Sequence, residues 1–85
     1  MTFEALWTAL RAAERIAEVY GLTVDAKIMA NPRLYITMRD AAHRPVCGVS
    51  LLGTAIDACQ SPEQLTDLVE REVAGVLRAR QGAVS

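Results

Sequence analysis

The residues best suited to chemistry lie close together in the stretch NPRLYITMRDAAHRPVCGVS, residues 31–50. Cys47 follows His43 by four positions, and Arg44 lies between them. A cysteine becomes a nucleophile when a neighbouring base or positive charge favours its thiolate, and His43 or Arg44 could act in this way. The sequence offers no third residue to orient the histidine and no oxyanion-stabilising element. We therefore interpret His43 as a turn residue and Cys47 as a half-buried cysteine, and we predict no catalytic residues.

No metal or cofactor site is expected either. The spacing of Cys47, Cys59 and His43 does not match that of a zinc site. The sequence has no glycine-rich phosphate loop and no paired carboxylates beside a base. A chain of 85 residues also leaves little depth for a substrate pocket. These features predict a protein that is not an enzyme and needs no cofactor.

Length and composition indicate one compact domain over residues 1–85. Hydrophobic residues make up 52% of the chain and charged residues 22%, which is typical of a globular protein. A domain of this size buries only about 60–65% of the surface that its unfolded chain exposes, so a homodimer or a partner complex would add stability. The net charge of −1 disfavours a strong non-specific grip on nucleic acid.

The first residues, MTFEALWTALRAAERIAEVYG, do not have the pattern of a signal peptide. They lack a basic first region, and charged residues interrupt their apolar positions. No run in the chain approaches the roughly eighteen apolar residues that a membrane span needs. We therefore expect a cytoplasmic protein without membrane contact, in which both cysteines are reduced.

Two amphipathic helices are predicted, over residues 3–20 and 61–80. In both, apolar residues recur at steps of three and four. Thr2 and Ser61 are suited to cap the helix starts, and Gln64 completes a capping box in the second helix. Gly21 is suited to end the first helix. Residues 81–85 are expected to fray.

Between the helices, the apolar residues alternate with a period of two. Residues 23–30 and 33–40 are predicted strands joined by a tight turn at Pro32, and residues 45–53 are a third strand. The third strand leaves two choices of inward face, either Cys47, Val49 and Leu51 or the residues between them. Residues 54–60 are either a short helix or a loop. The prediction is an α+β fold of order α-β-β-β-α, in which both helices pack on one face of a three-stranded antiparallel sheet.

The face of the sheet away from the helices is the first candidate surface. The alternation places Lys27, Arg33 and Arg39 there as a basic patch around Tyr35. Such a patch could contact an acidic protein surface, or stack a base and hold phosphates, or serve only as a solvated strand face. Because sheet-based RNA readers use two or three aromatic residues and Tyr35 is alone, we do not expect direct nucleic-acid binding.

An acidic run is the second candidate surface. Arg71 is the only basic residue in residues 57–72. The acidic residues of this segment are Asp57, Glu63, Asp67, Glu70 and Glu72. The run could bind a basic groove on a nucleic-acid-handling protein, or it is a solvated helix face whose charges suit the helix dipole. We select Asp57, Glu63, Asp67 and Glu70 as its candidate contact residues.

Trp7 lies on the apolar stripe of the first predicted helix and is expected in the core. Alternatively, if that stripe is wider than the sheet beneath it, Phe3 and Trp7 would anchor a homodimer.

The order of elements resembles that of the double-stranded-RNA-binding domain. That family relies on a lysine-rich start to its last helix, whereas SPEQLTDLVERE in this chain is acidic, so its RNA function is not carried over. In size, expected location and the acidic run DACQSPEQLTDLVERE, the chain is similar to small accessory proteins of phages and mobile elements, including the anti-CRISPR inhibitors. This resemblance implies a protein that blocks a nucleic-acid-binding host complex by occupying its surface.

The hypothesis from the sequence is therefore a non-enzymatic protein-binding module, with an inhibitor of the anti-CRISPR type as its narrower form. An RNA-binding module and a structural homodimer are the alternatives.

Overall fold

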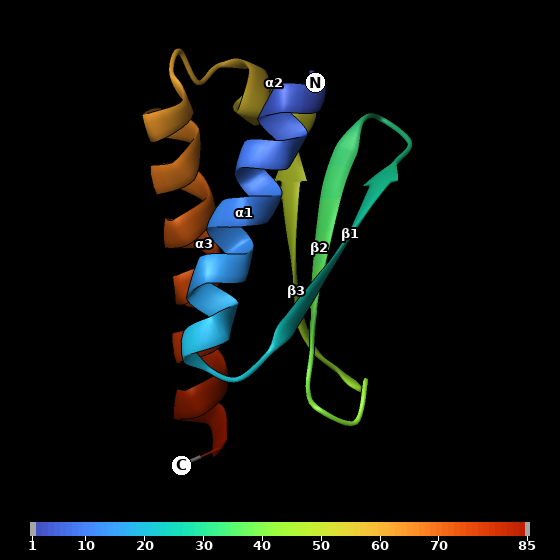
Figure 1. The fold of residues 1–85 in the computed structure, drawn as a ribbon, viewed down its shortest axis with the longest axis vertical. Helices are drawn as coiled ribbons and strands as arrows, with labels where there is room; N and C mark the ends of the chain where they lie inside the picture. The colour runs from blue at the N-terminus through green and yellow to red at the C-terminus, as the bar shows by residue number, and fades with distance from the viewer. Residues whose placement is uncertain (1, 85) are drawn as a thin grey trace.

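A computed structural model describes residues 2–84, with side chains for residues 2–80. The chain forms α1 (Phe3–Val19), β1 (Thr23–Met29), β2 (Arg33–Arg39), β3 (Pro45–Leu52), α2 (Gly53–Asp57) and α3 (Pro62–Val84). The strands make one antiparallel sheet in the order β1-β2-β3, and α1 and α3 lie on one side of it (Figure 1). The predicted α+β fold is confirmed. For residues 54–60, where a short helix and a loop were both considered, the structure has the short helix α2, which ends at Asp57. Fraying was predicted for residues 81–85, which lie outside the residues whose side chains the structure describes.

The ends of α1 follow the predicted capping signals. The backbone N–H of Ala5 donates to Thr2 Oγ1, with 3.1 Å between the two atoms. Gly21 has a φ of 71°, which lets the chain turn away from the helix in a left-handed conformation. The N–H of Leu22 then donates to the carbonyl of Ala17 at 3.0 Å, so that a last-turn carbonyl of the helix is satisfied.

The register of the sheet fixes which side chains share a face. In β3, Val49 and Leu51 are buried and Cys47 is half-buried, so these three residues face the helices. This finding resolves the choice that the alternation of β3 left open. On the opposite side, which we call the open face, one row across the strands contains Met29, Arg33 and Leu52, and the next row contains Lys27, Tyr35 and Ser50.

The core lies between the helices and the inner face of β2 and β3. All the fully buried residues of α1 are alanines, which allow α1 and α3 to approach each other closely. The buried core residues of the described chain are Ala9, Ala12, Ala13, Ala17, Leu34, Ile36, Met38, Val49, Leu51, Ile56, Leu65, Val69, Val73 and Leu77.

The helices leave part of β1 uncovered, and one prediction fails there. Ala26 and Ile28 point to the predicted apolar side of β1 but are exposed, while Val24 is half-buried. Trp7 was expected in the core, yet 55% of it is exposed. The reason is that the alanine stripe of α1 forms the packed surface, which leaves Trp7 on the flank of the helix. Figure 1 shows β1 running away from α1 toward the end of the strand at Met29.

Candidate functional site

The open face contains a cluster of exposed apolar side chains. Tyr35, Met29 and Leu52 are 42%, 47% and 48% exposed, and they occupy two adjacent rows of the sheet. The ring of Tyr35 lies over Gly48, where a Cβ atom would be only 2.6 Å from Tyr35 Oη. An aromatic ring therefore approaches this mid-strand glycine closely. Because the Tyr35 ring packs against this glycine, the sheet backbone defines the position of the ring.

Two cations border this cluster. Lys27 lies beside Tyr35 in one row, and Arg33 lies between Met29 and Leu52 in the next. Among the described residues, no hydrogen bond or ion pair involves the side chain of Lys27 or Arg33. We call Lys27, Met29, Arg33, Tyr35 and Leu52 the open-face patch.

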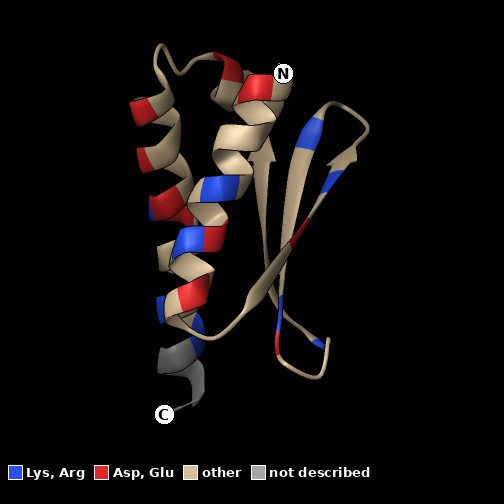
Figure 2. Ribbon diagram, in the orientation of Figure 1, with Lys and Arg blue, Asp and Glu red and all other residues tan. Residues whose placement is uncertain are grey.

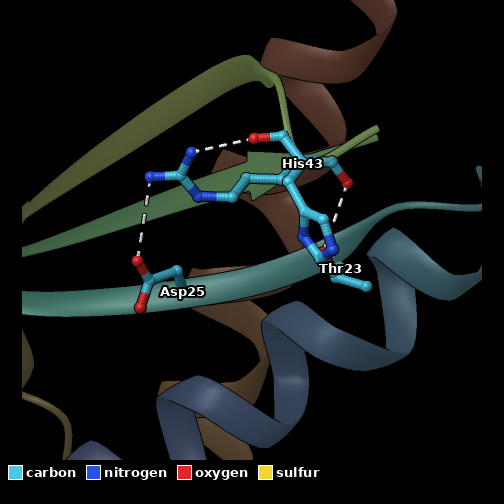
Figure 3. Close-up of polar contacts among 4 residues, drawn as sticks. Thr23, Asp25 and His43 are labelled. Atoms are coloured by element: carbon cyan, nitrogen blue, oxygen red, sulfur yellow. Dashed lines mark hydrogen bonds and ion pairs between the residues drawn. The ribbon is translucent and has the colours of Figure 1, made fainter. Parts of the chain in front are cut away.

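Arg39 is on the same face but is engaged within the chain. Its Nη1 donates to the carbonyl of His43 at 3.2 Å, and its Nη2 lies 3.9 Å from Asp25 Oδ2 (Figure 3). Thr23 Oγ1 also donates to the Arg39 carbonyl at 3.4 Å. Arg39 thus ties β1 to the turn after β2, and of the predicted basic residues it is the one that the structure uses internally.

His43 belongs to a turn, as predicted. Asp40 Oδ1 accepts hydrogen bonds from the backbone N–H groups of Ala42 (2.9 Å) and Arg44 (3.0 Å), which closes the loop between β2 and β3. His43 takes a φ of 63° inside this loop and is exposed. The turn therefore accounts for the presence and the conformation of His43.

The environment of Cys47 does not favour a thiolate. Its Sγ lies 4.0 Å from Met38 Sδ on the helix side of the sheet. Burial raises the pKa of the Cys47 thiol, and the positive charge of Arg80 lowers it by a smaller amount. In the described chain, no hydrogen bond joins His43 and Cys47. The pair lacks the geometry and the electrostatics of a nucleophile and its base.

The predicted acidic residues divide into two groups. Glu63, Asp67 and Glu70 line one shallow hollow on α3, whereas Asp57 lies on the separate helix α2. Arg15 of α1 borders the same hollow, and its Nη1 is 3.7 Å from Glu70 Oε1. Figure 2 shows these acidic positions in the half of α3 nearer to α2. We call Glu63, Asp67 and Glu70 the acidic flank, and Arg15 partly neutralises it.

An apolar groove runs between α1 and β1. Phe3, Trp7 and Ile28 are 79%, 55% and 56% exposed along it, and Leu34 is buried at its base. The groove is lined by Phe3, Leu6, Trp7, Leu10, Ala26, Lys27, Ile28 and Leu34. Arg11 lies over the Trp7 ring, 5.8 Å from its centroid, so the indole has a cation on one side.

The sequence analysis missed Met29 and Leu52. The alternation from Thr23 onward already places Met29 on the same face as Lys27, so a signal for Met29 was present. Leu52 could not be assigned because both faces of β3 carry apolar residues.

Two further properties concern the described residues alone. They contain no group of three or more His, Cys, Asp and Glu residues arranged to hold a metal ion. Within the same part of the chain, no helix combines the length and the apolar character that crossing a membrane requires.

We compared the chain with protein-family models, with curated proteins and with solved structures, and nothing matches it in any of the three comparisons.

Proposed function

We propose that this chain is a protein-binding module that acts through the open-face patch and not through chemistry. The observation that carries the proposal is the combination of Tyr35, Met29 and Leu52, each more than 40% exposed, with two cations, Lys27 and Arg33, that have no partner within the described chain. Tyr, Met and Arg are enriched in protein interfaces, where apolar anchors occupy the centre and charged groups surround them. An exposed face of this composition suits a partner that has an apolar centre with acidic residues around it.

An inhibitor that occupies a nucleic-acid-binding complex is the narrower form of this proposal. It draws support from the acidic flank, because Glu63 and Asp67 have no ion-pair partner among the described residues. Because Arg15 partly neutralises Glu70, the acidic flank supports a binding function less strongly than the open-face patch does. The two surfaces require partners of opposite charge and can be tested separately.

The open-face patch is tested by site-specific photocrosslinking in extracts of the source cells. A photoreactive residue at position 52 is compared with one at position 71, an exposed site on α3. We expect adducts with a defined protein from position 52 only. Equal adducts from both positions, or none from position 52, would reject the patch as the contact surface.

The partner identified in this way is then purified for affinity measurements. We expect Arg33→Glu to weaken binding at least about tenfold, because Arg33 lies between Met29 and Leu52 and arginines in interfaces are common hot spots. Arg71→Glu makes the same charge change at an exposed position elsewhere and should leave the affinity unchanged. Unchanged affinity in Arg33→Glu would contradict the proposal.

The acidic flank is tested with Glu63→Lys/Asp67→Lys. Glu14→Lys/Glu18→Lys is the matched control, since it reverses two exposed carboxylates at the same i,i+4 spacing on α1. Loss of inhibition of the partner's nucleic-acid binding in the first variant alone would support the inhibitor. Binding of wild-type chain to single-stranded RNA that weakens steeply with added salt would favour an RNA-binding module instead.

A further inference from the structure

The outer edge of β1 is open to pairing with another strand. Within residues 2–84, β2 is the one strand next to β1, and the two strands pair over residues 23–29 of β1 without a register shift. Strand edges of this kind present unpaired N–H and C=O groups that can bind a further strand. β1 contains no proline and no bulge, which are common means of blocking an edge.

The other edge strand of the sheet, β3, is better protected against pairing with an added strand. β3 begins at Pro45, which has no N–H to donate, and its pairing with β2 has a register shift at Met38/Arg39. β3 also leads directly into α2. An added strand would therefore pair with β1 and not with β3.

We propose that β1 pairs with β1 of a second copy of this chain, antiparallel about a two-fold axis at Ala26. Such a dimer has one continuous six-stranded sheet. An isologous contact requires a surface that is complementary to itself, and the sequence of β1 meets this requirement at this register.

Charge complementarity selects the register. With Ala26 opposite Ala26 of the second copy, Asp25 lies opposite Lys27 of the second copy, and the same pair occurs again across the axis. Shifting the axis to residue 25 would place two copies of Asp25 opposite each other, and shifting it to residue 27 would do the same with Lys27. Opposite charges in directly paired positions stabilise a sheet, and like charges destabilise it. Asp25 would then lie between Lys27 of the second copy and its own Arg39, 3.9 Å away.

The apolar side of β1 fits the same arrangement. At this register Val24 lies opposite Ile28 of the second copy, and the small residue Ala26 is at the axis. Because Ala26 and Ile28 line the apolar groove, the grooves of the two copies meet at the axis. Phe3, Trp7 and Ile28, each more than half exposed, would lose contact with water there. Burial of this apolar surface supplies the driving force, and strand pairing supplies the orientation.

This dimer does not depend on the proposed function. Its axis is at the edge of the sheet, so each open-face patch remains uncovered at Met29, Tyr35 and Leu52, and only Lys27 of the patch is engaged, by Asp25 of the second copy. Arg33 lies on β2, away from the axis. Arg33→Glu therefore tests partner binding without altering the dimer contact.

The test uses two charge variants, Asp25→Lys and Lys27→Asp, and their mixture. Each variant alone would place like charges opposite each other at two positions of the dimer. We therefore expect the dissociation constant of its dimer to be at least about tenfold higher than that of the wild type. In a mixture, every Lys of one variant lies opposite an Asp of the other, and the heterodimer should form with nearly wild-type affinity. Sedimentation equilibrium from about 1 μM to 500 μM measures all three species.

A second measurement uses the intrinsic fluorescence of the protein. Trp7 is the only tryptophan, so its emission reports on the groove. We expect the emission maximum to shift to the blue as wild-type protein or Arg33→Glu protein is concentrated, and to stay unchanged in Lys27→Asp.

Three outcomes would overturn the proposal. The wild type could remain monomeric up to about 500 μM. The single variants could dimerise like the wild type, which would mean that another face forms the dimer. The mixed variants could fail to form a heterodimer although each is folded by circular dichroism, which would mean that β1 edges do not pair at this register.

Discussion

Tyr35 and Gly48 form a contact in which an aromatic ring covers a glycine on the neighbouring strand. The nearest atoms of the Tyr35 side chain, the phenolic Oη and the ring carbon Cζ, lie 2.6 Å and 2.9 Å from the position that a Cβ of residue 48 would take. Any larger residue at position 48 must therefore displace the ring. Because Tyr35 is at the centre of the open-face patch, this glycine controls the geometry of the proposed binding surface.

The contact predicts an energetic coupling between the two positions. In a Tyr35→Ser background, Gly48→Ala should stabilise the domain by about 0.5 kcal/mol, because alanine restricts the unfolded chain. In the wild type, that gain should be offset by displacement of the ring, with a coupling energy of about 0.5–1.5 kcal/mol. Urea unfolding of the four proteins measures the coupling. Equal effects of Gly48→Ala in both backgrounds would contradict the contact.

Cys47 predicts a pH dependence of stability. Burial raises the pKa of its thiol in the folded state, so the folded protein holds this proton more tightly than the unfolded chain does. The stability from this group is fully present below the unfolded pKa and is lost as the pH rises through the folded pKa. Two proteins are compared in a Cys59→Ala background, one that keeps Cys47 and one with Cys47→Ala. As the pH rises through the alkaline range, the free energy of unfolding should fall more steeply in the protein that keeps Cys47. Parallel pH profiles of the two proteins would contradict the burial of the thiol.

The start of α3 is held by two hydrogen bonds of Gln64, of which the side-chain bond goes to Gln60 and not to Ser61 as in the predicted capping box. Ser61 Oγ accepts from the Gln64 N–H at 3.2 Å, and Gln64 Oε1 accepts from the Gln60 N–H at 2.8 Å. We expect Ser61→Ala to lower the free energy of unfolding by about 1 kcal/mol, because the first turn loses its cap. Ser50→Ala, at an exposed position on β3, is the control and should change it by less than about 0.5 kcal/mol. Equal effects of the two substitutions would exclude the cap.

The exposure of Trp7 predicts a small effect on the stability of the monomer. Since more than half of its surface is in contact with water, Trp7→Ala should cost less than about 1.5 kcal/mol in dilute solution. Leu77→Ala, at a position that is 2% exposed, should cost about 2–5 kcal/mol. Thermal unfolding at low micromolar concentration compares the two. A cost for Trp7→Ala as large as that for Leu77→Ala would mean that the indole is buried.

The elements of the fold were predictable because their signals are local. Caps at Thr2 and Ser61, the stop at Gly21 and the alternation of residues 23–40 act within a few residues of the chain. The placement of Lys27, Arg33, Tyr35 and Arg39 on one face of the sheet follows from the period of two in β1 and β2.

The sequence by itself determined the type of each main helix and strand, because helix periodicity, strand alternation and capping depend on neighbours in the chain. Only the tertiary structure decided which apolar residues are covered. Trp7 and Ile28 have the pattern of core residues, but the alanine stripe of α1 packs against the other elements and leaves them beside an open groove. The state of Arg39 was decided in the same way, since its contacts with Asp25 and His43 join three segments of the chain. Coverage and pairing depend on how whole elements pack in space, and periodicity along the chain contains no information about that.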